Sequence, residues 1–148
     1  MTKFFKGLTY LVLLVFVVAY FSGALDDSPS KSKLSDEKIA SMDEFLAPEI
    51  CLEFAENKIR AEDEWKGKIA KVKGQIRSIA VDAFGAPFML LDCSPILGKK
   101  VRFVLPKEDK SKLKDFSIGD FVTGVGTVKP AVLGEIWIED VRIVKKGL

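Results

Sequence analysis

The spacing of the apolar residues changes at Gly67, and this change constrains the fold more than any other feature of the sequence. From Lys68 to Ala80, small or apolar side chains alternate with charged or polar ones, which is typical of a β-strand with one buried face. A glycine in the middle of such a strand, here Gly74, indicates a bulge or a sharp bend, as small barrels need. Residues 67–148 are therefore expected to form a barrel domain.

The rest of this domain contains further strand patterns separated by turns. The expected elements are strands at 88–92, 99–105, 121–128 and 135–144, and a short lysine-rich helix at 106–116. Three strands, a helix and two more strands follow the order of an OB-fold, a five-stranded Greek-key barrel. The predicted fold class is therefore mainly β, with this barrel preceded by one or two α-helices and by an N-terminal hydrophobic helix.

Residues 36–66 are predicted to form N-terminal helices that pack on the barrel. Ser35 is a suitable N-cap for the first of them. Its apolar stripe consists of Ile39, Met42 and Leu46. Pro48 ends this helix and begins the next, which runs to about Trp65. The apolar face of the second helix consists of Ile50, Cys51, Phe54, Ala55 and Ile59.

Residues 1–25 have the composition of an export signal, because two lysines precede an uninterrupted apolar run. Cleavage after Ala24 would give a secreted or periplasmic protein, but the 18 residues from Leu8 to Leu25 are long enough to span a bilayer. An uncleaved signal-anchor is favoured, since aromatic residues lie near its outer end, and residues 26–35 then form a linker. We expect a single-pass cell-membrane protein with its C-terminal domain outside the cytoplasm.

The sequence lacks the residue types or motifs that several kinds of catalytic, metal and phosphate-binding site require. The sequence contains no histidine, which removes the commonest general base and the commonest metal ligand. Two cysteines are too few for a zinc site, and no glycine-rich phosphate loop is present. We therefore predict no catalytic residue, no metal and no cofactor, and we expect that the protein is not an enzyme.

Cys51 and Cys93 are an even pair, and in an oxidising compartment they are candidates for a disulfide. Such a bond requires the two Cα atoms to lie within about 7 Å of each other. The alternative is that each cysteine is a small buried apolar residue. The sequence leaves both possibilities open.

Residues 49–144 resemble a bacterial family of OB-fold domains described as similar to the tRNA anticodon-binding domain. The matching residues are Asn57, Ala61, Trp65, Gly67, Lys68, Gly74, Ile76, Ile79, Gly119, Asp120 and Gly126. Gly124 departs from the pattern, because such strands place an inward aliphatic residue there, and looser packing is expected at this position. The resemblance implies the fold and an exported or membrane-tethered protein without established activity, and it transfers no function.

OB-folds usually bind ligands on the face around their second and third strands, between the loops that join strands one to two and four to five. The candidate binding residues on the polar face are Lys71, Lys73, Arg77, Lys100 and Arg102. Phe84 and Trp137 are the aromatic candidates, although core packing is an alternative for both, whereas Phe88 and Phe103 are expected in the core. Val132 and Leu133 form an apolar loop tip that suits a protein or membrane contact.

Charge is distributed unevenly along the chain. Residues 1–65 carry 7 basic and 12 acidic side chains, whereas residues 66–148 carry 16 basic and 9 acidic ones. This asymmetry indicates an anionic partner or a lysine-rich solvated surface. We expect a non-catalytic binding module that contacts the membrane through its N-terminal segment and binds an envelope protein, a glycan or an anionic polymer. The alternative is binding of single-stranded nucleic acid or oligonucleotides through the basic face.

Overall fold

The structure, a computed structural model, describes residues 34–94 and 97–147, and residues from Ser35 onward belong to one compact unit. The predicted signal-anchor at 1–25, its cleavage and most of the linker lie outside the described residues. Within the described part of the chain, no helix has the length and apolar character needed to cross a membrane.

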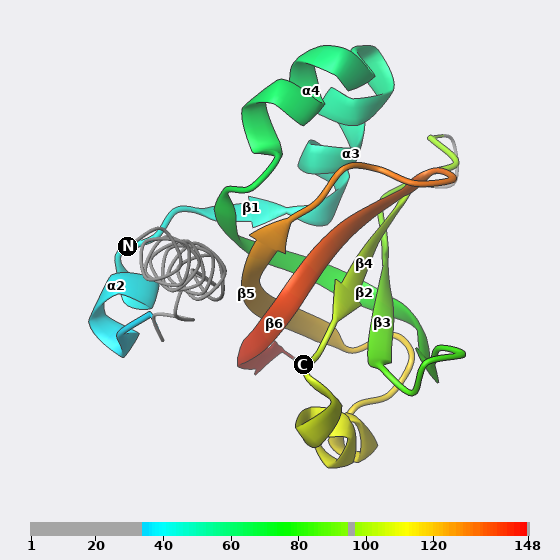
Figure 1. The fold of residues 1–148 in the computed structure, drawn as a ribbon. Coiled ribbons are helices and arrows are strands. Elements are labelled where there is room, and N and C mark those ends of the chain that lie inside the picture. The colour runs from blue at the N-terminus through cyan, green and yellow to red at the C-terminus, as the bar shows by residue number, and fades with distance from the viewer. Residues whose placement is uncertain (1–33, 95–96, 148) are drawn as a thin grey trace, which may run out of the picture. The chain divides into compact units, whose positions relative to one another are not determined.

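The unit is built around a closed barrel of five strands (Figure 1). The strands are β2 (Ile69–Val81), β3 (Pro87–Asp92), β4 (Lys100–Val104), β5 (Phe121–Val128) and β6 (Glu135–Gly147). With the short edge strand β1 (Glu44–Leu46), the sheet order is β1-β2-β3-β4-β6-β5, and an additional pairing of β2 with β5 closes the barrel. A 3-10 helix, η1 (Lys107–Asp115), connects β4 to β5. The predicted OB-fold is thus confirmed.

Strand β2 has two halves with different neighbours. Its first half pairs with β5, and its second half pairs with β3. The register shift on the β3 side falls between Ile76 and Ser78, two residues beyond the glycine at which a bulge or bend was expected. Gly74 serves close packing instead, because a Cβ atom there would lie 2.9 Å from Cδ1 of Leu91 and 3.0 Å from Cβ of Ala47. The glycine thus lets β3 and the helix that begins at Ala47 approach the strand.

The N-terminal helices differ from the predicted pair. Helix α2 (Asp36–Ala40) is capped by Ser35 as expected, but it ends six residues earlier than its apolar stripe suggested. The short strand β1 (Glu44–Leu46) follows and pairs in parallel with Lys71–Lys73 of β2. The helical spacing was misleading here because the backbone of this segment is hydrogen-bonded to a distant strand.

The predicted second helix is divided at Asn57 into α3 (Ala47–Glu56) and α4 (Lys58–Trp65). The Asn57 backbone is extended, with φ −154°, and its Oδ1 accepts a hydrogen bond from the N–H of Arg60 at 3.1 Å. The break rotates the apolar stripe, so that Ile59, expected on the buried face, is 76% exposed. Nε1 of Trp65 donates to Glu53 at 2.6 Å and joins the two helices.

The core lies inside the barrel and under α3. Its largest buried side chains include Phe54, Phe103, Ile50, Ile76, Met89, Leu91, Ile136 and Ile138. The expectation of loose packing at Gly124 is wrong, because the ring of Phe103 fills the space that a side chain would take. A Cβ atom at Gly124 would lie 2.7 Å from Cε2 of Phe103 and 2.7 Å from Cγ1 of Val141.

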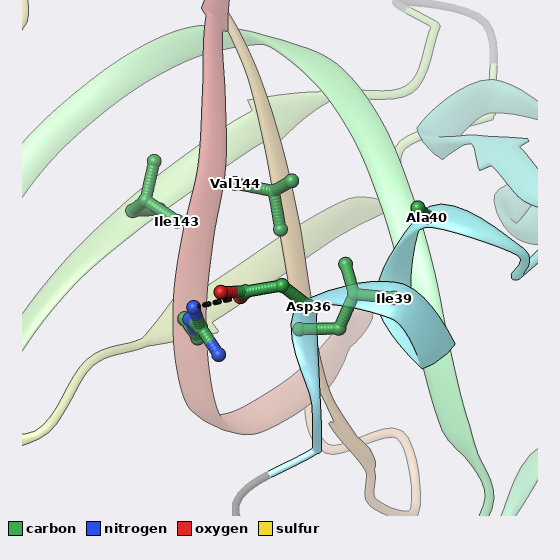
Figure 2. Close-up of a pocket in the computed structure, with 6 residues that line it drawn as sticks. Asp36, Ile39, Ala40, Ile143 and Val144 are labelled. Carbon is green, nitrogen blue, oxygen red and sulfur yellow. Dashed lines mark hydrogen bonds and ion pairs between the residues drawn. The ribbon is translucent and has the colours of Figure 1, made fainter.

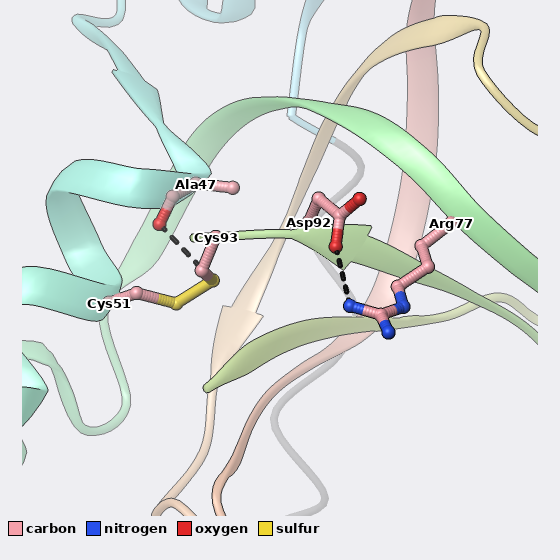
Figure 3. Close-up of a disulfide and its surroundings, with 5 residues drawn as sticks. All are labelled: Ala47, Cys51, Arg77, Asp92 and Cys93. Carbon is pink, nitrogen blue, oxygen red and sulfur yellow. Dashed lines mark hydrogen bonds and ion pairs between the residues drawn. A yellow bond between two sulfur atoms is a disulfide. The ribbon is translucent and has the colours of Figure 1, made fainter. Parts of the chain in front are cut away.

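A disulfide joins α3 to the end of β3 (Figure 3). Cys51 and Cys93 are both buried, and their Cα atoms are 5.9 Å apart. The sulfur of Cys93 also lies 3.6 Å from the carbonyl oxygen of Ala47, in the first turn of α3. The helix is therefore attached to the barrel by a covalent bond as well as by its apolar face.

Candidate functional site

OB-folds usually bind ligands on the outer surface around their second and third strands, which are β3 and β4 here. Strand β6 pairs with β4 and continues this surface. In each strand, buried residues alternate with partly exposed ones along this surface. The register places Leu90, Arg102 and Trp137 side by side across the three strands. The outward residues, here called the β3–β4–β6 face, are Phe88, Leu90, Asp92, Lys100, Arg102, Val104, Glu135 and Trp137.

Arg102 lies at the centre of this face and contacts three neighbours. Its guanidinium carbon is 3.9 Å from the ring centroid of Phe88 and 5.0 Å from that of Trp137. Its Nε donates to Oε2 of Glu135 at 2.6 Å, and the side chains of this ion pair are 16% and 22% exposed. Cation–π contact and a partly buried ion pair together fix the arginine in one orientation.

Phe88 is therefore a member of the face and not of the core, contrary to the sequence-based expectation. Strand β3 begins at Pro87, and Pro87, Met89 and Leu91 are its buried residues, so that Phe88 points outward. The alternation of this short apolar strand could not be read from the sequence, because apolar residues occupy both faces. The contact between Phe88 and Arg102 was accordingly missed.

Trp137 is half-buried, and its ring lies beside Arg102 on the outer surface. Its indole Nε1 is buried and has no hydrogen-bond partner among the described residues. A buried N–H without a partner costs roughly 1–3 kcal/mol. The ring thus carries an unsatisfied donor at the edge of the face.

The other candidate residues of this region are partly neutralised by carboxylates. Nη1 of Arg77 donates to Asp92 at 3.0 Å (Figure 3). Lys100 stands opposite Asp92 in β3 and Glu135 in β6. One cation–carboxylate pair therefore lies on this face and a second joins it to β2, and both lower its attraction for a polyanion.

Lys71 and Lys73 do not join this face. They lie on the half of β2 that pairs with β1 and β5, opposite Glu44 and Leu46 of β1. Only the second half of β2 borders β3. The predicted row of five basic residues is therefore divided between two regions of the barrel, because β2 exchanges neighbours halfway along.

The two loops that flank the face lie at opposite ends of β4. The β2–β3 loop is next to the end of β4, where the N–H of Leu105 donates to the carbonyl oxygen of Pro87. The β5–β6 loop is next to the start of β4, where the N–H of Lys100 donates to the carbonyl oxygen of Gly134. Phe84, in the first loop, is 84% exposed, and Leu133, in the second, is 99% exposed.

Two hollows lie outside the β3–β4–β6 face. One, of about 180 Å³, lies between α2 and β6 and is lined by Asp36, Ile39 and Val144 among others (Figure 2). Asp36 and Arg142, which also lines it, form an ion pair. The other, of about 410 Å³, is lined by Val81, Lys110, Ser111, Leu113 and Lys114 between β2 and η1. The first is small and contains an ion pair in its lining, whereas the second is lined by two apolar residues, two lysines and a serine.

Comparison with solved structures finds one that shares this fold over most of the chain. A lipoprotein from Klebsiella pneumoniae subsp. pneumoniae, described as a candidate nucleic acid-binding protein, matches with a TM-score of 0.64 and 20% identity. The match covers 75% of this chain and 98% of that chain. A protein from Leishmania major Friedlin, described as a candidate aspartyl-tRNA synthetase, matches with a TM-score of 0.48 and 13% identity, over 80% of this chain and 23% of that chain.

A comparison with curated protein sequences finds no match. The sequence does match one protein family, described as tRNA_anti-like, over residues 1–140. This range includes α3, the disulfide, strands β2 to β5 and the first part of β6. The chain therefore belongs to the tRNA_anti-like family.

Proposed function

We propose that the chain is an exported, membrane-tethered binding module without catalytic chemistry, and that it holds another envelope protein on the β3–β4–β6 face. The observation that carries this proposal is the contact of Arg102 with Phe88, Trp137 and Glu135. Tryptophan, other aromatic residues and arginine are enriched at the centres of protein interfaces. An anionic polymer fits this face less well, because Arg77 and Arg102 are both paired with carboxylates.

A photo-cross-linking residue in place of Leu90 tests this proposal in intact cells. Leu90 pairs with Arg102 in the β3–β4 register and is partly exposed. We expect a discrete protein adduct that weakens when Trp137→Ser is introduced. The matched control places the same cross-linker at Ile59, an exposed apolar residue of α4. An adduct with glycan only, the same adduct from both positions, or no adduct from Leu90 would contradict the proposal.

Single-stranded nucleic acid is the second candidate ligand, and the description of the Klebsiella pneumoniae protein favours it. Phe88 and Trp137 offer two rings on one face, and base stacking contributes about 1–3 kcal/mol per base. Titration of the full chain in detergent with labelled RNA and DNA oligonucleotides at rising salt distinguishes this ligand. Affinity that falls steeply with salt and is weakened by Arg102→Ala would support it over a protein partner.

The proposed location is tested separately from the ligand. Protease is added to cells whose outer envelope layers have been opened and whose cytoplasmic membrane is intact. It is expected to digest the barrel domain. The intact mass of the purified protein then decides between an uncleaved anchor and cleavage after Ala24. A domain that resists protease until the cytoplasmic membrane is broken would contradict an extracytoplasmic position.

A further inference from the structure

The β2–β3 loop presents one aromatic side chain to solvent. Oδ1 of Asp82 accepts hydrogen bonds from the N–H groups of Phe84 and Ala86, both at 2.9 Å, and Gly85 has φ +82°. These bonds hold the loop in a defined turn. The Phe84 ring nevertheless stays 84% exposed, and it lies outside the cluster around Arg102. The turn thus holds the Phe84 ring in solvent, where it does not pack against the barrel.

The larger of the two hollows lies next to this loop. Val81, three residues before Phe84, and Leu113 are its apolar lining residues, and Lys110 and Lys114 line it as well. Lys112, between these lysines, pairs with Asp109 at 2.8 Å. Lys110 and Lys114 are exposed and make no ion pair with any described residue. The region formed by Val81, Phe84, Lys110, Leu113 and Lys114, here called the η1 end, combines apolar surface with unpaired positive charge.

The first helix of the domain, α2, contacts the second half of β6, which leads toward η1. Asp36 pairs with Arg142, in the second half of β6. Further along this strand, Lys146 contacts Asp115 at the end of η1 and pairs with Asp120 at 3.1 Å. Leu133 lies before the start of β6, at the opposite end of the barrel. Asp36, at the start of the described domain, therefore lies nearer η1 than the β5–β6 loop.

We propose that the η1 end rests on an anionic phospholipid surface, with Phe84 at the boundary between headgroups and acyl chains and Lys110 and Lys114 over the headgroups. Aromatic rings favour this boundary, and each lysine near an anionic leaflet increases the bound population roughly fivefold. The inference rests on the membrane tether of the proposed function. Through that tether even a weak contact is populated, because the domain stays at high effective concentration near the bilayer.

Fluorescence quenching in reconstituted vesicles tests this contact with the full chain. Ala83→Cys places a fluorophore beside Phe84, and Val132→Cys places one at the opposite end as the matched control; Cys51 and Cys93 are bonded to each other and take no label. The vesicles contain phosphatidylcholine, with or without phosphatidylglycerol, and a quencher attached to lipid. Flotation first establishes that the chain has inserted.

We expect several-fold stronger quenching at position 83 than at position 132 in vesicles with phosphatidylglycerol, and similar weak quenching at both in phosphatidylcholine alone. Phe84→Ser, and the pair Lys110→Glu with Lys114→Glu, should each remove most of the difference. The pair Lys66→Glu with Lys68→Glu, exposed lysines near the other end, should leave it unchanged. Equal quenching at the two positions, or no effect of the η1-end variants, would overturn the proposal.

The outcome is independent of the protein partner, because the vesicles contain none. Failure of flotation would count against the tether itself, whereas insertion without differential quenching would count against the η1-end contact alone. Binding of an envelope protein to the β3–β4–β6 face is measured by cross-linking from Leu90 and is unaffected by either result.

Discussion

Glu135 accepts a 2.6 Å hydrogen bond from Nε of Arg102, and this pair neutralises the arginine at the centre of the β3–β4–β6 face. Glu135→Gln keeps a hydrogen-bond acceptor but removes the negative charge that neutralises Arg102. We expect oligonucleotide affinity at low salt to rise several-fold in this variant, from a weak starting value, because phosphate contacts follow net charge. Fluorescence anisotropy measures the change. Unchanged affinity would show that Arg102 is inaccessible to phosphate.

The disulfide makes a large contribution to stability. Cys51 and Cys93 are 42 residues apart in sequence, and cross-linking a loop of this length stabilises the folded state by about 4 kcal/mol. Cys51→Ala combined with Cys93→Ala should lower Tm by roughly 15 °C. Reduction of the unmodified protein should give a similar loss in calorimetry. A Tm within a few degrees of the unmodified protein would contradict the assignment of the bond as a major stabilising element.

Gly124→Ala should destabilise the barrel, because the new Cβ would meet the Phe103 ring at 2.7 Å. Overpacking of a filled core costs about 1–3 kcal/mol. Adding Phe103→Leu, which makes room, should recover part of the loss. Denaturant unfolding of the two single variants and the double variant measures the coupling. Simple additivity of the two losses would mean that the ring is not what fills this space.

Leu133→Asn should stabilise the protein. Leu133 and Gly134 are the central residues of a tight turn closed by hydrogen bonds between Val132 and Glu135, and both have positive φ, 50° and 82°. Turns of this kind favour Asn-Gly. Since the leucine is 99% exposed, no packing is lost, and a gain of about 0.5–1 kcal/mol is expected from denaturant unfolding. Gly134→Ala, the control, should destabilise. A loss in Leu133→Asn would contradict this account.

Asp120 makes stability depend on pH. A hydrogen bond from the N–H of Ser117 at 2.9 Å, and then one from Lys146, hold the pKa of Asp120 below its usual value of 3.8. A carboxyl whose pKa is lower in the folded state contributes stability above its unfolded pKa and loses it as the pH falls through the folded pKa. The stability difference between the unmodified protein and Asp120→Asn should therefore shrink below pH 3.8. Denaturant midpoints across this range measure it, and a constant difference would contradict the role of the carboxylate.

Strand positions in the barrel could be predicted from the sequence because alternation records one buried face in each strand. β4 and the first half of β2 alternate charged and apolar residues, so their buried side chains lie on the expected face. Beyond the register shift in β2 the alternation changes, and Ile79 packs against the core. β3 was placed correctly along the chain, but its apolar residues on both faces concealed the outward direction of Phe88. The local sequence pattern therefore predicts the position of each strand along the chain. It does not predict which side chains of a uniformly apolar strand point into the core.

The errors before the barrel have a different origin. Glu44–Leu46 became β1 through pairing with Lys71–Lys73, a contact that no local pattern records. The division of the basic row likewise follows from β2 changing partners, with Lys71 and Lys73 beside β5 and Arg77 beside Asp92. Asn57, by contrast, carried a readable signal, since an asparagine within a helical pattern is a common N-cap.

Barrel closure also imposes an order on folding. Ile69 of β2 pairs with Thr127 of β5, and β3, β4 and η1 all lie between them in the chain. Closing so long a loop costs entropy before its contacts form, which slows folding. When the chain is delivered with its N-terminal end first, Cys51 and Cys93 become available before β5 does. The covalent bond between α3 and β3 can therefore form on an open sheet, which then serves as the template on which the last two strands assemble.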